Sequence, residues 1–118
     1  MNRSDRPRQM LLNRLGLAQR AGRLISGEDS ILKAMRSGKV KLVVLAEDAS
    51  ANTAKRYRDK CSHYGIPLIQ YGTREELGAS IGRDHRAALA VTDEGFAGLI
   101  RKSLQIPSEV KDIEQTGK

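Results

Sequence analysis

Two adjacent acids, Glu47 and Asp48, directly follow the apolar segment LVVLA at residues 42–46. The carboxyl end of a buried strand is where α/β enzymes place catalytic groups, so this pair could serve in acid–base chemistry. Acids at a strand-to-helix corner more often accept hydrogen bonds from backbone N–H groups. We favour the structural role, and since no other motif calls for catalysis, the sequence predicts a protein that is not an enzyme and has no catalytic residue.

Residues that could bind a metal ion or a nucleotide are few. Cys61 and His63 are close in the chain, but no second pair completes a zinc site. The chain contains neither G-x-G-x-x-G nor G-x-x-x-x-G-K-[ST], the glycine motifs that hold nucleotide phosphates. We therefore expect no metal and no cofactor. The single cysteine cannot form an internal disulfide, which indicates a reducing, cytoplasmic location.

The segment SGEDSILKAMRSGKVKLVVLAEDAS, residues 26–50, places two acids at the head of a predicted helix and bases farther along it. Acids first and bases last match the helix dipole, so a solvated helix face is the simplest interpretation of the segment taken alone. Helical geometry also puts positions 29, 30, 33, 36 and 37 on one polar face, away from the apolar positions. That face is available to a ligand.

The positive charge lies in the first half of the chain. Of the formal net charge of +7, residues 1–60 contribute +8 and residues 61–118 contribute −1. A one-sided basic surface suits a polyanionic partner such as nucleic acid, although basic residues also keep small proteins soluble. Aromatic residues are too few and too scattered for a base-stacking platform, so contacts to shape and backbone are the expected means of recognition.

Helical periodicity and capping residues alternate with short apolar runs along the chain. The predicted helices span residues 10–21, 26–38, 50–65, 73–82 and 93–100, and the predicted strands span residues 24–25, 42–46, 68–71 and 87–91. Ser26 with Asp29, and Thr73 with Glu76, have capping-box spacing. This alternation predicts a three-layer α/β/α sandwich with a small parallel or mixed sheet.

One domain is expected, over residues 10–104. Residues 1–9 are predicted to form a basic flexible tail and residues 105–118 a polar C-terminal tail. We see no membrane span and no signal-like segment.

Four segments occur together in the order and spacing of a known family: LGLAQRAGRLISGE, LVVLAEDAS, IPLIQYGTREELGASIG and ALAVTDEGFAGLI. They resemble the kink-turn-binding ribosomal proteins, the L7Ae family, and within it the small bacterial YlxQ-like branch, over roughly residues 11–104. The resemblance implies a four-stranded mixed sheet. It also implies binding to RNA kink-turns, in which a bulge and sheared G·A pairs bend a duplex sharply. In the family, the start of the second helix and a loop before the last strand meet the RNA.

The family's helix motif reads G-x-N-E-x-x-K, and here Gly27 and Lys33 match it while Asp29 and Ser30 take the Asn and Glu positions. The second region corresponds to residues 82–87, whose charges favour phosphate contacts. Lys33 can donate to guanine O6 and N7 or to a phosphate. The RNA-binding residues that we expect are Gly27, Glu28, Asp29, Ser30, Lys33, Arg36, Lys39, Arg83, Asp84, His85 and Arg86.

We interpret the chain as a non-catalytic, monomeric RNA-binding protein of the cytoplasm that recognises kink-turn or similarly bent structured RNA, in association with the ribosome. The alternative is a protein-interaction module on the translation machinery with weak or lost RNA binding. Binding to RNA should weaken steeply as salt rises, whereas an apolar protein interface should not.

Overall fold

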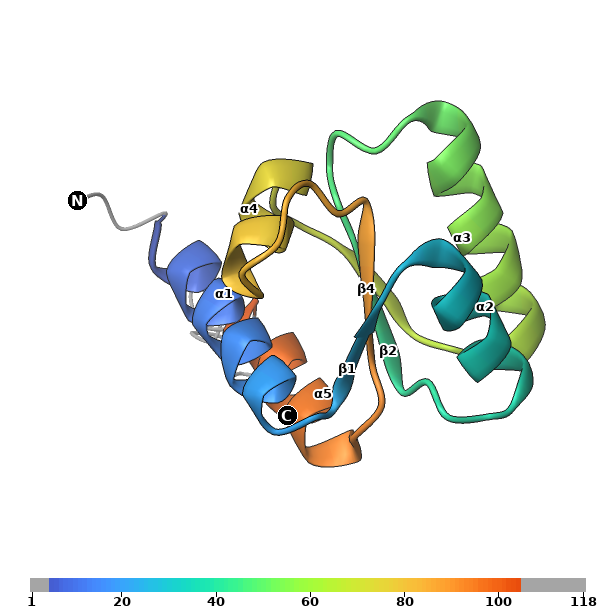
Figure 1. The fold of residues 1–118 in the computed structure, drawn as a ribbon, viewed down its shortest axis with the longest axis horizontal. Coiled ribbons are helices and arrows are strands. Elements are labelled where there is room, and N and C mark those ends of the chain that lie inside the picture. Colours follow the sequence, from blue (N-terminus) through green and yellow to red (C-terminus); the bar gives the residue numbers. More distant parts are fainter. Residues whose placement is uncertain (1–4, 105–118) are drawn as a thin grey trace, which may run out of the picture.

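The computed structural model of the chain describes residues 5–104, which form helices and short strands in alternation (Figure 1). The helices are α1 (Asp5–Arg20), α2 (Glu28–Arg36), α3 (Ala51–Tyr64), α4 (Arg74–Ser80) and α5 (Glu94–Ser103). The strands are β1 (Leu24–Ser26), β2 (Leu42–Leu45), β3 (Leu68–Gln70) and β4 (Ala88–Val91). The predicted C-terminal tail, residues 105–118, lies outside the described residues. No helix between residues 5 and 104 is long and apolar enough to cross a membrane.

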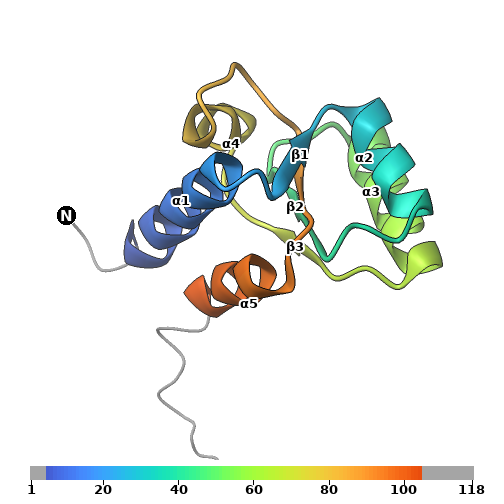
Figure 2. The ribbon, with the colours of Figure 1, turned by 60° about the horizontal axis from the view of Figure 1, so that its bottom comes forward.

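The four strands form one mixed sheet in the order β1-β4-β2-β3. Strand β4 pairs antiparallel with both β1 and β2, and β2 pairs parallel with β3. Helices α1, α4 and α5 cover one face of the sheet, and α2 and α3 cover the other (Figure 2). The predicted three-layer α/β/α sandwich with a four-stranded mixed sheet is therefore confirmed.

The core lies on both faces of the two central strands. In β2, Leu42 and Val44 pack toward α1 and α5, whereas Val43 and Leu45 pack toward α2 and α3. All residues of β2 and β4 are buried. Burial on both faces explains why these strands are apolar throughout, without alternation.

Helix α1 begins at Asp5, which corrects both its predicted start at Met10 and the assignment of residues 5–9 to a flexible tail. Pro7 falls in the first turn, where its missing N–H group costs no hydrogen bond. The Arg8 guanidinium also lies 2.8 Å from the Glu76 carboxylate, which ties the start of α1 to α4. Neither feature can be recognised from the composition of residues 1–9, which is polar and basic like that of a flexible tail.

Helix α2 begins differently from the prediction. Ser26 is the last residue of β1, paired with Leu89, and the residue that precedes the helix is Gly27, which has no side chain to cap it. The predicted capping box of Ser26 with Asp29 is therefore absent. The other predicted capping box, of Thr73 with Glu76, is present.

Candidate nucleic-acid interface

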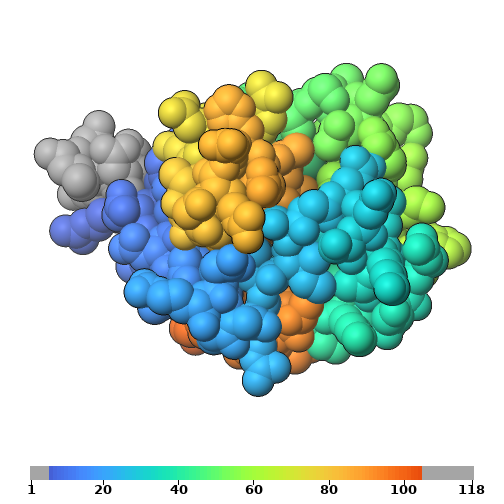
Figure 3. Space-filling model, viewed as in Figure 1, coloured from blue at the N-terminus to red at the C-terminus, as the bar shows by residue number. Residues whose placement is uncertain are grey.

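The start of α2 and the loop between α4 and β4 lie next to each other at one end of the sheet (Figures 1 and 3). Strand pairing causes this, because Ser26 at the end of β1 lies opposite Leu89 near the start of β4. The two segments surround a hollow of about 140 Å³. Its lining is Gly27, Glu28, Thr53, Tyr57, His85, Arg86, Ala87 and Ala88. The two regions that the sequence analysis identified separately thus form one surface, completed by α3.

Gly27 sets the geometry of the helix start. Its φ of 97° lies in the region that favours glycine, and a Cβ there would meet no atom within 4 Å, so the backbone conformation and not the space selects glycine. The first helical hydrogen bond runs from the Ile31 N–H group to the Gly27 carbonyl, at 2.9 Å. With no side-chain cap, the N–H groups before Ile31 are available to an anion, at the positive end of the helix dipole.

Glu28 forms an ion pair that the sequence analysis did not anticipate. Arg56 of α3 places its Nη1 atom 2.6 Å from Glu28 Oε2, with 42% and 39% of the two side chains exposed. Such an exposed pair contributes only about 0–1 kcal/mol to stability. Its electrostatic effect is more important here, because it offsets the negative charge of Glu28, which lines the hollow at the helix start.

Tyr57 forms part of the hollow's wall. It belongs to the buried side of α3, and 3% of its surface is exposed. Burial, followed by the nearby Glu28 carboxylate, raises the pKa of Tyr57 to about 12. Its hydroxyl is therefore neutral at physiological pH and can donate a hydrogen bond.

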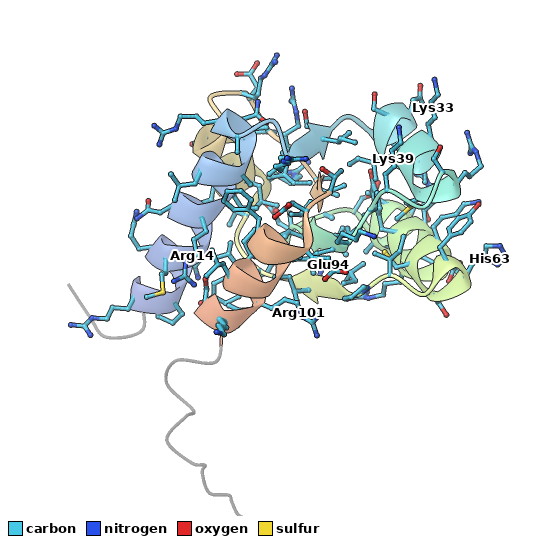
Figure 4. All side chains as sticks on the ribbon, turned by 90° about the horizontal axis from the view of Figure 1, so that it is seen from below. Arg14, Lys33, Lys39, His63, Glu94 and Arg101 are labelled. Carbon is cyan, nitrogen blue, oxygen red and sulfur yellow. The ribbon has the colours of Figure 1, made fainter. Side chains whose placement is uncertain are left out.

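The polar face of α2 lies beside this hollow. Asp29, Ser30 and Lys33 are exposed, as helical geometry predicted, but none of them lines the hollow (Figure 4 labels Lys33). Among residues 5–104, no carboxylate lies within ion-pair distance of Lys33. Its ammonium group is thus free to meet a ligand on this face.

Arg36 and Lys39 are not gathered with the other expected residues. Arg36 is in the last turn of α2 and lines a different hollow, and Lys39 follows the helix (Figure 4). The structure therefore does not place either residue beside Gly27. Helical periodicity indicated the correct face for Arg36, but it does not say which end of the helix the ligand occupies.

The loop between α4 and β4 is held at two points on α4. The Arg83 N–H group donates to the Gly78 carbonyl at 2.8 Å, and the Arg86 N–H group donates to the Arg74 carbonyl at 3.0 Å. The loop backbone approaches α4 so closely that a Cβ atom on Gly78 would lie 1.6 Å from the Asp84 carbonyl oxygen. Glycine at position 78 is therefore what allows the loop to sit where it does.

The loop's expected contact residues face different surroundings. His85 and Arg86 line the hollow, whereas Arg83 and Asp84 are exposed outside it. The Arg86 Nη1 atom donates to the His85 carbonyl at 2.9 Å, and Arg86 is half-buried. This contact orients Arg86 toward the hollow's edge, where its guanidinium can still bind a phosphate.

Asp48 supports the loop indirectly. Its Oδ1 atom accepts a hydrogen bond from the Arg74 N–H group at 2.8 Å, and this bond is the main cause of a lowered Asp48 pKa. The structural role expected for an acid at this strand-to-helix corner is confirmed for Asp48. Asp48 thus helps to hold the start of α4, to which the loop is attached.

The described residues include no group of three His, Cys, Asp or Glu side chains that could hold a metal ion. Cys61 is a free, buried cysteine of α3. Burial raises its pKa to about 11, so the thiol is protonated at neutral pH and a poor nucleophile.

Comparison with known proteins gives consistent matches. The model of the ribosomal protein L7Ae/L30e/S12e/Gadd45 family matches residues 9–100. The chain is 52% identical over 83 residues to "RNA-binding protein YlxQ" of Bacillus subtilis (strain 168), covering 70% of this chain and 83% of that protein. It is 41% identical over 90 residues to the protein of the same name in Enterococcus faecium, covering 76% and 86%. A solved structure, of a protein with unknown function from Bacillus halodurans C, superimposes with a TM-score of 0.77 at 40% identity, covering 80% of this chain and 96% of that one.

Proposed function

The chain belongs to the ribosomal protein L7Ae/L30e/S12e/Gadd45 family, as its motifs predicted, and we propose that it binds kink-turn or similarly bent RNA where α2 begins. The observation that carries the proposal is the single surface formed by the uncapped start of α2 and the α4–β4 loop. The names of its bacterial relatives, which describe RNA-binding proteins, support the choice of ligand.

We assign the backbone of the RNA to the helix start. Gly27 presents no side chain, so a phosphate can approach the N–H groups at the positive end of α2. Arg86 supplies a charged guanidinium from the loop, and the neutral Tyr57 hydroxyl can bond to a ribose or phosphate oxygen. These contacts recognise shape and carry no sequence information by themselves.

Base recognition is assigned to the exposed face of α2. Lys33 can donate to O6 and N7 of a guanine, whereas an ionised Asp29 can only accept, for example from guanine N1 or N2. Ser30 is shorter than Glu and uncharged. The chain therefore contacts the same side of the RNA as proteins with the G-x-N-E-x-x-K motif. Its side chains, however, offer a different set of hydrogen-bond donors and acceptors.

We further propose that the protein acts as a monomer in the bacterial cytoplasm, without catalysis, on ribosomal or other structured RNA. The ribosomal members of its family and its bacterial relatives support this setting. No residue of the interface needs to make or break a covalent bond for this function.

Energy transfer between fluorophores on the two arms of a kink-turn RNA tests the proposal. Adding the protein should bring the arms together and raise the transfer, since binding favours the bent form. The matched control is the same RNA with its G·A pairs replaced by Watson–Crick pairs, which should stay extended. An unchanged signal for the kink-turn RNA at low salt would favour the alternative of a protein-interaction module.

A further inference from the structure

A second, larger hollow lies at the opposite end of the sheet from the candidate interface. Ala88 begins β4 beside the first hollow, whereas α5, which follows the other end of β4, lines the second. The second hollow has a volume of about 480 Å³ and lies among the ends of α2 and α3 and the body of α5. Figure 4 shows the molecule from this end, with Glu94 and Arg101 labelled on α5. We call this feature the basal hollow.

Three cations from three different segments face the basal hollow: Arg36, Lys41 and Arg101. Within residues 5–104, no carboxylate pairs with any of them, although Glu94 belongs to the same lining. Arg56, by contrast, forms an ion pair with Glu28 at the start of α2, so its charge is partly neutralised. Unpaired cations around a concave space concentrate positive potential there and attract an anion.

Three glycines leave the basal hollow open. At Gly38, Gly65 and Gly98, an added Cβ would meet no atom within 4 Å. Gly38 and Gly65 have φ values of 73° and 67° at helix ends, which accounts for glycine there. Gly98 lies inside α5, where glycine costs about 1 kcal/mol relative to alanine and no close contact requires it. Its absence of a side chain keeps the hollow accessible to a ligand's backbone.

Three apolar residues of the lining are almost fully buried, whereas Tyr64 and Ile66 are partly exposed and Pro67 is exposed. Met35, Val40 and Ala97 are 1%, 6% and 3% exposed. A ligand therefore meets the cationic side chains, glycine backbone and the exposed parts of residues 64–67, instead of deep pockets for large apolar groups. This favours a phosphodiester backbone over an acidic peptide, which would need such pockets to bind specifically.

The carbonyl groups at the ends of α2 and α3 weaken the attraction for an anion, but they are already engaged. The N–H groups of Gly38 and Lys39 donate to carbonyls of α2 at 3.1 and 3.0 Å. The Ile66 N–H group donates in the same way to the Cys61 carbonyl of α3, at 2.8 Å. The unpaired side-chain charges therefore dominate the potential in the hollow.

We propose that the basal hollow binds the sugar–phosphate backbone of a second RNA segment, so that the protein holds RNA at both ends of its sheet. Arg36 and Arg101 would each bind a phosphate through paired N–H groups, and Lys41 would act as a point charge. The proposal rests on the proposed RNA-binding function but not on recognition of a bend.

The test compares Gly98→Glu with Gly98→Gln in the full chain, with a short straight RNA duplex as the probe. An added Cβ at position 98 meets no atom within 4 Å, the two side chains are nearly equal in size, and both residues are better helix formers than glycine. Only glutamate adds a negative charge to the hollow. We expect the glutamate variant to bind the duplex on the order of fivefold more weakly than the glutamine variant at low salt. Lys60→Gln is the control for net charge. It removes one positive charge from α3, outside the basal hollow, and should lower duplex affinity by less than about twofold.

Glycine amide signals in NMR locate the contact. The straight duplex should shift the amides of Gly38, Gly65 and Gly98 more than that of Gly27, which lines the hollow at the other end. Equal duplex affinity of the two Gly98 variants, or a shift of Gly27 without shifts of the basal glycines, would overturn the proposal. A polyglutamate peptide that shifts the basal amides when the duplex does not would also overturn it, in favour of a protein partner. None of these outcomes depends on whether the protein prefers bent RNA.

Discussion

Replacing Gly78 with alanine should move the loop that completes the candidate interface. The added Cβ would lie 1.6 Å from the Asp84 carbonyl oxygen and 2.5 Å from its carbonyl carbon. Both are backbone atoms, so no side-chain rotation relieves the contact. The loop must lift from α4, which stretches the bond between the Arg83 N–H group and the Gly78 carbonyl, now 2.8 Å.

The expected loss of stability follows from three contributions. Overpacking typically costs about 1–3 kcal/mol, and loss of the backbone hydrogen bond adds about 1 kcal/mol. The better helix propensity of alanine offsets about 1 kcal/mol of this loss in the free energy of unfolding. The net loss of about 1–3 kcal/mol corresponds to a melting temperature lowered by about 4–8 °C per kcal/mol for a domain of this size. Because the loop carries Arg86, affinity for kinked RNA should also fall, by about tenfold.

Thermal melting and titration with a kinked RNA measure the two effects. Gly98→Ala is the matched control, because it makes the same substitution inside a helix where nothing lies within 4 Å. It should raise the melting temperature, because alanine is the better helix former and meets no close contact there. If Gly78→Ala melts at or above the wild-type temperature and binds kinked RNA with wild-type affinity, the position of the loop does not depend on glycine at position 78.

Four further predictions concern single side chains. Lys33→Ala should weaken binding to kinked RNA by about 1–3 kcal/mol with little change in melting temperature, and equal affinity at fixed salt would contradict its assignment. Asp29→Asn should tighten binding by supplying an amide donor, and a gain that persists when the G·A pairs are replaced would reduce this to a charge effect. Arg56→Gln should weaken binding by exposing the Glu28 carboxylate, and adding Glu28→Gln should restore it. The pKa of Cys61 is raised from 9.0 to about 11, so the folded state retains a proton that the unfolded state loses. Wild-type stability should therefore fall between pH 9 and 11 more steeply than that of Cys61→Ala, and parallel melting curves against pH would contradict this.

Features of the fold that depend on neighbouring residues could be predicted from the sequence. Thr73 caps its helix as expected, and Ser50 and Asp93, the first residues of two predicted helices, do the same, because a cap needs only the N–H group a few residues ahead. Ser26 has the same local pattern but is held in β1 by Leu89, a residue far away in the chain. Pairing of β1 with the distant strand β4 therefore prevents the cap that the local pattern predicts.

Only those parts of the candidate site that a sequence motif identifies could be predicted. Gly27 and the loop before β4 were identified from the resemblance, and the structure brings them together. Arg56 and Tyr57 were missed as site residues because their position beside Glu28 depends on how α3 packs against α2. The basal hollow was missed for the same reason, since its cations come from three separate segments.

The affinity ratio between a kinked and a straightened RNA measures whether the protein recognises the bend. Both RNAs should have the same length and base composition as far as the replaced G·A pairs allow, and both titrations should use the same salt concentration. We predict that the kinked RNA binds at least about tenfold more tightly, a difference of about 1.4 kcal/mol. Equal affinity for the two RNAs would contradict it, because the protein would then be a general binder of polyanions.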